Sequence, residues 1–241
     1  MKILSIDTST QCASCALIDD TRLLGEIIFN YKKQHSVIMM DIIHNLLSNC
    51  GSTLQDVDGF VVSKGPGSFT GLRIGMSTIK GLSHGTKKPF VSVSTLDSLA
   101  FNLSHSNGII CSIIDALRDN VYYGIYRFDS HGKMIKIEDV SRSALDNLLQ
   151  KLNSHEEQVT FIGDCTEKFK DRILNSSPNF VIASYNNNIV RASSLAFIGR
   201  EFLEKGDYDN LYDSAPIYLI KSQAEREYEE KISLQRKENK E

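Results

Sequence analysis

The beginning of the chain alternates between short apolar runs and polar turns. The runs cover residues 2–7, 13–18 and 22–29, and the turns contain Thr8, Ser9, Thr10, Asp19 and Asp20. Runs of this length bounded by turn residues are typical of strands, and two-residue turns join antiparallel neighbours. We therefore predict three antiparallel strands at the start of the chain.

The pattern then changes to alternating helices and strands. We predict helices over 36–50, over 72–84 and from Thr95 onward, with Gly51 and Gly85 as stop signals, and strands over 59–62 and 90–93. A second series starts near Gly108, with strands over 109–114, 121–128, 134–140 and 159–162 and helices over 143–152, 166–173 and 193–205. Two similar series predict an α/β fold with two related lobes, residues 1–103 and 104–220, followed by a charged tail over 221–241.

Composition excludes several classes of protein. With 41% hydrophobic residues among 241, the chain can bury a large core, and its net charge of -3 provides no general attraction for nucleic acid. No run of 18 apolar residues occurs, so we expect no membrane span and a cytoplasmic chain. The five cysteines are scattered, and Cys12 and Cys15 fall on opposite faces of a predicted strand, which favours buried thiols over a metal or redox site.

The most distinctive segment is SKGPGSFTGLRIG, residues 63–75, which joins a predicted strand to a predicted helix. Its glycines are Gly65, Gly67, Gly71 and Gly75. Glycine is used where the backbone takes a positive φ or approaches another backbone, and a helix N-terminus favours an anion or a close partner. Leu72 and Arg73 stand where a Walker A loop needs Lys and Ser or Thr, and the spacing GxGxxxG departs from the dinucleotide fingerprint. A loop that only shapes the corner is an equal alternative to a binding loop.

The helices on either side of this loop are apolar over more than the single stripe that a surface helix needs. On a helical wheel, the apolar residues of 37–50 spread over roughly 200° to 260°, against about 100° for packing on one side. The helix over 72–84 is similar. Such helices are buried on two sides, either by the rest of the chain or by a partner protein, for which methionine-rich surface is typical. The candidates for a partner interface are His35, Ser36, Met39, Met40, Ile43, Leu47, Leu72, Arg73 and Met76.

One short segment indicates a ligand. Asp7, Thr8 and Ser9 follow the first strand, where an acidic residue can orient a nucleotide-bound Mg²⁺ through water, but an ordinary turn has the same sequence. The six histidines form no metal-binding pair, no GxSxG motif surrounds a serine, and Arg118 between Asp115 and Asp119 indicates a local ion-pair loop. We find no set of nucleophile, base and oxyanion donor, so we predict no catalytic residue and no metal site.

Four segments carry a resemblance to the TsaB (YeaZ) family: ILSIDTST at the N-terminus, HS at 35–36, VSKGPGSFTGLRIG at 62–75 and VSVSTLDSLA at 91–100. The similarity is dense up to Ala100, continues through IDALRDNVYYGIY, and reappears in APIY at 215–218. TsaB is a subunit of the bacterial machinery that makes threonylcarbamoyladenosine in tRNA. The resemblance therefore implies a role in tRNA processing.

The resemblance also implies a fold and partners. The fold is the two-lobed one, with mixed sheets, that actin, hexokinase and heat-shock chaperone ATPases share. The partners are a second copy of the chain, or the related catalytic subunit TsaD, bound through the two early helices, together with the ATPase TsaE; tRNA is reached only through this complex. TsaD has a histidine-pair metal motif where this chain has residues 92–99 without histidine, which argues against catalysis and against the peptidase activity suggested by the M22 label of related proteins.

We therefore expect a non-catalytic scaffold that holds TsaD in its active shape. It would have no tightly bound cofactor, and binding of ATP or ADP at the level of the complex is left open. The alternative is an ATP-dependent enzyme of the same fold, with Asp7 at a metal and the loop 65–71 at phosphate. A free-standing peptidase ranks last.

Overall fold

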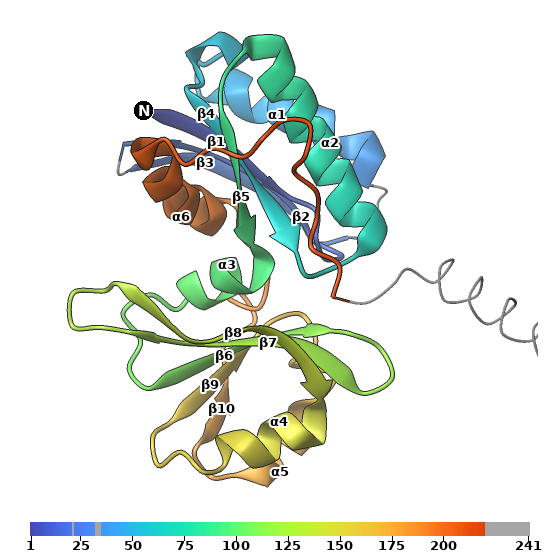
Figure 1. Cartoon of the computed structure of the whole chain (residues 1–241), viewed down its shortest axis with the longest axis vertical. Coiled ribbons are helices and arrows are strands. Elements are labelled where there is room, and N and C mark those ends of the chain that lie inside the picture. Colours follow the sequence, from blue (N-terminus) through green and yellow to red (C-terminus); the bar gives the residue numbers. More distant parts are fainter. Residues whose placement is uncertain (21, 32–34, 220–241) are drawn as a thin grey trace, which may run out of the picture.

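The computed structural model describes residues 1–20, 22–31 and 35–219, and the strands of this part form two five-stranded sheets (Figure 1). The elements of the first half are β1 (Lys2–Asp7), β2 (Ala13–Asp19), β3 (Arg22–Phe29), α1 (His35–Asn49), the 3-10 turn η1 (Leu54–Asp56), β4 (Gly59–Gly65), α2 (Phe69–Thr86), β5 (Phe90–Ser94) and α3 (Thr95–Phe101). Those of the second half are β6 (Ile109–Asp115), β7 (Asn120–Phe128), β8 (Met134–Ala144), α4 (Leu145–Leu152), β9 (Val159–Ile162), α5 (Lys170–Ser176), β10 (Phe180–Ile182) and α6 (Ala192–Lys205).

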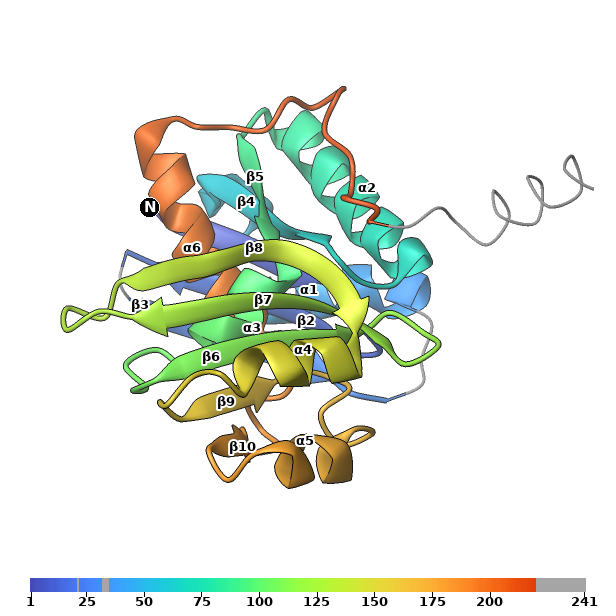
Figure 2. The same ribbon diagram turned by 60° about the horizontal axis from the view of Figure 1, so that its bottom comes forward.

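The two sheets have the same topology. The strand orders are β3-β2-β1-β4-β5 and β8-β7-β6-β9-β10, where the first three strands of each half pair antiparallel and the last two are parallel. The helices repeat as well. In the first half α1 leads from β3 to β4 and α2 from β4 to β5, and in the second half α4 leads from β8 to β9 and α5 from β9 to β10. Figure 2 shows the second sheet with α4 and α5 against it. The predicted α/β fold with two related halves and mixed sheets is therefore confirmed.

Alternation along the strands gives the first sheet two apolar faces. Leu4 and Phe60 pack on one face with residues of α1 and α2, while Ile3 and Val61 pack on the other with Leu195 of α6. This division arises because successive side chains of a strand point to opposite faces. All of these side chains are fully buried. The first sheet therefore lies between the α1–α2 pair and α6.

The helices α3 and α6 are exchanged between the halves. Leu96 and Leu99 of α3, which follows the first sheet, pack with Ile110 and Tyr126 of the second sheet, while α6 packs on the first. Figure 1 shows α3 at the junction between the sheets. We call the first sheet with α1, α2 and α6 the first lobe, and the second sheet with α3, α4 and α5 the second lobe. The expected boundary between residues 103 and 104 does not separate these lobes, because the last helix returns to the first one.

Several predicted boundaries differ from the structure. The helix α2 begins at Phe69 rather than Leu72 because Ser68 caps it, and it runs past Gly85 to a left-handed Lys87 (φ 57°). The strand β8 extends to Ala144, which delays α4, and residues 166–169 form turns before α5. The short strand β10 was not predicted. The predicted charged tail over 221–241 lies outside the described residues.

Candidate interaction site

The glycine loop between β4 and α2 lies against the turn that follows β1. The hydroxyl of Thr8 donates a hydrogen bond to the carbonyl of Gly71 (2.7 Å). A Cβ at Gly71 would overlap the carbonyl oxygen of Thr8, and one at Gly67 would overlap that of Ser9. These glycines are therefore required by the close approach of two backbones. In this loop a positive φ occurs at Gly65 (φ 103°) and not at Gly67 or Gly71.

The N-terminus of α2 is held by the same turn. The N–H of Ser68 donates to the carbonyl of Ser9 (2.6 Å), and the hydroxyl of Ser68 accepts from the N–H of Gly71 (3.2 Å). One turn further along α2, a Cβ at Gly75 would lie 2.5 Å from the hydroxyl oxygen of Thr8. The glycine loop is thus filled by the chain's own backbone, which fixes the position of α2.

Asp7 lies at the carboxyl end of β1 and is fully buried. Its Oδ1 accepts from the N–H of Ser9 (3.3 Å), whereas its Oδ2 has no hydrogen-bond partner among the described residues. Burial raises the pKa of Asp7 to about 6, although the nearby hydroxyls of Ser63 and Ser9 act in the opposite direction. Neither hydroxyl reaches ordinary hydrogen-bond geometry with the carboxyl group. The predicted nucleotide residues Asp7, Thr8 and Ser9 therefore form a closed polar cluster under α2.

Most of the residues predicted at a partner interface lie in the core. Of the nine, five are at most 5% exposed: Met39, Ile43, Leu47, Leu72 and Met76. All of them except Leu72 belong to the core between these helices and the first sheet. For the four core residues the chain itself covers the apolar arc, because β3 contributes Leu24 and Ile27 to the same core. His35 is half-buried, with Nε2 2.9 Å from the carbonyl of Thr10. Only Ser36, Met40 and Arg73 are exposed.

The exposed side of the α1–α2 pair forms a different surface, which we call the outer face. It consists of Val37, Met40, Asp41, His44 and Ser48 on α1 and Thr70, Arg73, Ser77, Gly81 and His84 on α2. Each set follows the i, i+3, i+4 spacing of one helix side. Val37 and Met40 are 66% and 51% exposed. This spacing is visible in the sequence, but the sequence does not show which side of α1 meets the sheet.

A segment over 207–219, which we call the strap, runs alongside α2 (Figure 1). Tyr218 stacks on Phe69 with ring centroids 4.5 Å apart, and its hydroxyl accepts from Nε of Arg73 (3.1 Å). The guanidinium of Arg73 also lies over the ring of Phe69 (3.9 Å). The amine of Lys80 donates to the carbonyl of Ser214 (2.8 Å). The exposed Arg73 is therefore held in place by residues far away in the sequence, which sequence reasoning missed.

Alanine at two glycines of α2 is expected to have opposite effects on stability. Gly71→Ala should lower the free energy of unfolding by about 2 kcal/mol, because the new Cβ meets a backbone carbonyl that cannot easily move. Gly81→Ala, on the exposed side with no atom within 4 Å, should raise it by up to about 1 kcal/mol. Urea unfolding followed by circular dichroism measures both, and equal stability of the two variants would contradict the packing described here.

Comparison with known proteins identifies the family to which the chain belongs. The protein of Bacillus subtilis (strain 168) named tRNA threonylcarbamoyladenosine biosynthesis protein TsaB is 36% identical over 230 residues, which cover 95% of this chain and 98% of that protein. The chain belongs to the TsaB family. TsaB of Buchnera aphidicola subsp. Baizongia pistaciae is 29% identical over 90% of this chain and 97% of its own length. A family model described as "TsaD: tRNA N6-adenosine threonylcarbamoyltransferase" matches residues 22–228 of the chain.

Solved structures show the same fold. YeaZ from Pseudomonas aeruginosa is similar with a TM-score of 0.74 at 23% identity, over 90% of this chain and 99% of that one. A second Pseudomonas aeruginosa structure, described as an uncharacterized protein with similarity to peptidase YeaZ, has a TM-score of 0.78 over 91% of this chain. At this level of identity the likeness concerns the fold alone.

Proposed function

We propose that this chain is a non-catalytic subunit in the biosynthesis of threonylcarbamoyladenosine in tRNA, and that its outer face binds a TsaD-like catalytic subunit. Its membership of the TsaB family supports the pathway. The exposure of Val37 and Met40 supports the surface, because two large apolar side chains one helical turn apart stand in water on a helix that needs no further covering for its own stability. Interface cores are built from such apolar and methionine side chains.

The role of the subunit is then to present a fixed surface. The outer face is backed by the buried Met39, Ile43 and Leu72, and the contact of Gly71 with Thr8 sets the position of α2. Binding to a surface that fits only one conformation of a partner shifts the partner toward that conformation. On this proposal the chain holds TsaD in its active shape, and in the absence of TsaD the same face pairs two copies of the chain. TsaE and its nucleotide join at the level of the complex.

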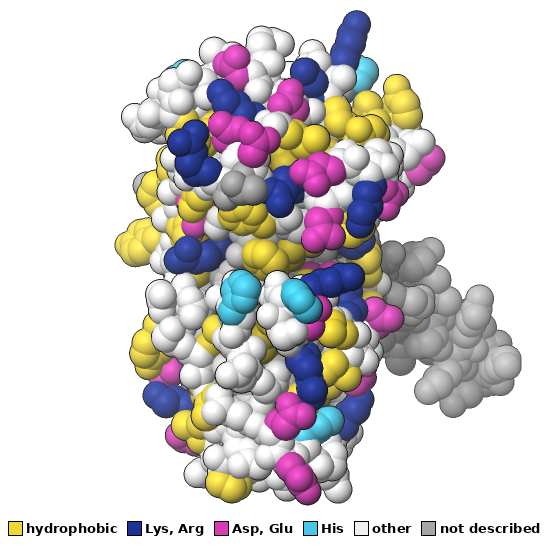
Figure 3. Space-filling view, turned by 90° about the vertical axis from the view of Figure 1, so that its left-hand side faces the viewer, with side chains coloured by type: hydrophobic (Ala, Val, Ile, Leu, Met, Phe, Trp, Pro, Cys, Tyr) yellow, Lys and Arg dark blue, Asp and Glu magenta, His cyan; other side chains and the backbone are white. Residues whose placement is uncertain are grey.

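Contact with tRNA is expected through the complex rather than through this chain alone. Its net charge is -3. On the face drawn in Figure 3, lysine and arginine side chains are interspersed with aspartate and glutamate. Binding of a nucleic acid backbone depends mainly on positive charge gathered on one surface, and this face has no such continuous patch among the described residues.

A second candidate function is an ATP-dependent enzyme of the same fold. One observation favours it, namely the buried Asp7, whose Oδ2 lacks a partner among the described residues. The closed cluster around Asp7 and the filled glycine loop favour the scaffold instead, because a nucleotide would have to displace the backbone of Thr8 and Ser9.

Among the described residues, no group of three or more His, Cys, Asp or Glu side chains could hold a metal ion. Nor is any helix in that part of the chain long and apolar enough to cross a membrane.

The purified chain is expected to form no modified nucleoside when it is mixed with tRNA and preformed threonylcarbamoyl adenylate, and to hold no stoichiometric transition metal. Addition of the TsaD-like subunit should produce the modification. Nucleoside analysis by liquid chromatography with mass spectrometry and elemental analysis measure the two outcomes. Activity of the lone chain, checked to be free of TsaD, would refute the scaffold, and ATP turnover by the lone chain would favour the second candidate.

A further inference from the structure

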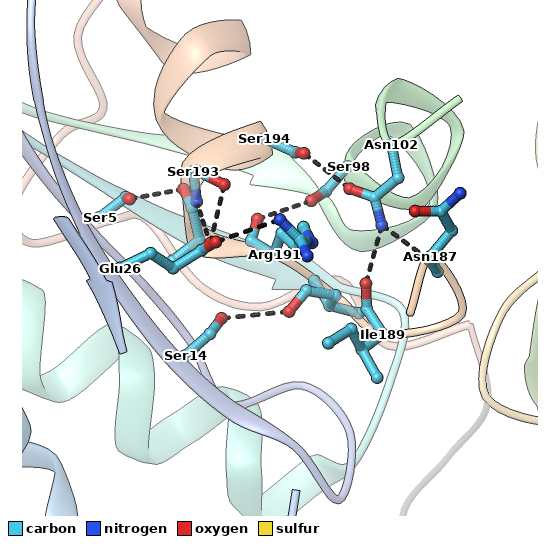
Figure 4. A network of polar contacts seen from close by, with 12 residues as sticks. Ser5, Ser14, Glu26, Ser98, Asn102, Asn187, Ile189, Arg191, Ser193 and Ser194 are labelled. Atoms are coloured by element: carbon cyan, nitrogen blue, oxygen red, sulfur yellow. Dashed lines mark hydrogen bonds and ion pairs between the residues drawn. The ribbon is translucent and has the colours of Figure 1, made fainter. Parts of the chain in front are cut away.

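The linker that leads from β10 to α6, residues 183–191, is bound through its main chain to the first sheet and to α3 (Figure 4). Three buried serines from three elements, β2, α3 and β1, donate to successive carbonyls: Ser14 to Val190 (3.1 Å), Ser98 to Arg191 (3.1 Å) and Ser5 to Ala192 (2.6 Å). Because buried carbonyls without partners are costly, these contacts tie the path of the linker to the first sheet and to α3.

Asn102, which directly follows α3, joins the linker to α6 with one amide group. Its Nδ2 donates to the carbonyls of Asn187 (2.8 Å) and Ile189 (2.8 Å), and its Oδ1 accepts from the hydroxyl of Ser194 (2.6 Å). The amide thus uses both of its donors and one acceptor site. These contacts connect the end of α3, which covers the second sheet, with the start of α6, which covers the first.

Glu26 on β3 binds the same part of the chain, the end of the linker and the start of α6, from the first sheet. Its carboxylate is buried, with a side-chain exposure of 8%, and Oε1 accepts from the N–H (2.9 Å) and the hydroxyl (2.8 Å) of Ser193. Its Oε2 forms an ion pair with Arg191 (3.4 Å). A negative charge in the first turn of a helix is favoured by the helix dipole and satisfies an N–H that has no partner within the helix. Glu26 therefore caps α6 from a separate strand.

The strand β3 also contacts the helix that carries the outer face. A Cβ at Gly25 would lie 2.9 Å from Cδ1 of Leu46 and 3.0 Å from Sγ of Cys50, so β3 and α1 are in close contact at the residue next to Glu26. Consecutive residues of β3 thus face α1 on one side of the sheet and α6 on the other.

We propose that Glu26 and Asn102 form an interlobe clamp that holds the second lobe at a fixed orientation to the outer face. Both side chains bind the linker or the first turn of α6, the segment through which the chain passes back from the second lobe to the first. Loss of either side chain should release the linker and leave the outer face intact. This inference concerns the isolated chain and does not depend on the proposed partner.

Hydrogen exchange of the full-length chain, followed by mass spectrometry, tests the clamp with matched controls. Asn102→Ala is compared with Asn153→Ala, because Asn153 ends α4 in the same right-handed conformation in which Asn102 ends α3. Glu26→Ala is compared with Glu157→Ala, since Glu157 pairs with Arg127 (2.8 Å) on the surface. Exchange in peptides covering 187–195 should accelerate about tenfold or more in the two clamp variants and little in the controls, with peptides of α1 and α2 unchanged.

Two results would overturn the clamp. One is exchange over 187–195 that is no faster in Asn102→Ala and Glu26→Ala than in their controls. The other is an acceleration that is uniform over all peptides, which indicates global destabilisation instead of local release. If Glu26→Ala does not fold, Ser98→Ala removes one linker contact with a smaller change and is judged by the same criteria. Small-angle scattering provides a second readout, because release of the second lobe should broaden the distribution of interatomic distances.

Discussion

Met40→Asp is expected to weaken binding of the proposed TsaD-like partner about 100-fold or more, and to dissociate the proposed homodimer, with little change in the stability of the chain. Met40 is 51% exposed on the outer face, so the free chain tolerates a charge there. In the complex the charge would be buried without a partner, at a cost of about 3–5 kcal/mol, and about 1.4 kcal/mol corresponds to a tenfold change in affinity. Isothermal calorimetry and sedimentation measure the two associations.

Met39→Asp is the matched control for this prediction. The two methionines are adjacent in the sequence, but Met39 is 1% exposed within the core beneath α1. The charge should therefore unfold the chain or strongly destabilise it, which thermal unfolding detects. Normal binding by both Met40→Asp and Val37→Asp would place the partner surface elsewhere on the molecule.

Asp7→Asn is expected to stabilise the chain by about 3 kcal/mol at pH 8. Burial raises the pKa of Asp7 from 3.8 to about 6, so the folded chain binds this proton more tightly than the unfolded chain does. The ionised carboxylate therefore costs stability that is absent below about pH 4, grows as the pH rises through about 6, and is constant above it. A pKa rise of this size corresponds to about 3 kcal/mol. Asparagine has no charge and removes this cost.

Denaturant unfolding of both proteins from pH 4 to pH 8 measures this difference. The two stability curves should diverge with rising pH between about 4 and 6 and run parallel above that. Asp139→Asn serves as the control, because the side chain of Asp139 is 94% exposed. A wild-type chain that gains stability relative to Asp7→Asn over this range would show that Asp7 is stabilised as a carboxylate, as it would be beside a bound cation.

The repeated architecture could be predicted because each half of the sequence contains three strands followed by alternating helices and strands. The long periodic helices α1 and α6 were placed within one residue of their observed start. The ends of helices and strands that depend on tertiary contacts were not placed as accurately. The start of α2 depends on a cap at Ser68 and on the turn at Thr8, and the end of β8 depends on its pairing with β7.

The candidate site was only partly predictable. The wheel of α1 showed an apolar arc that was too wide for one-sided packing, but it did not distinguish Met39, which faces the sheet, from Met40, which faces solvent. That distinction is made by the sheet and by Leu24 and Ile27 of β3, which pack on the same core. The contact of Tyr218 with Arg73 spans 145 positions of sequence, and no local pattern indicates it.

The exchange of α3 and α6 has a consequence for how the chain folds during synthesis. Ile3, Val61 and Val93 pack against α6, which is completed only at Lys205. A nascent chain that has emerged as far as β10 therefore has one apolar face of its first sheet still uncovered, and apolar surface of this kind promotes aggregation of folding intermediates. The first sheet is therefore fully covered only after the last helix has been made, and we expect the two halves to reach their native state as one cooperative unit.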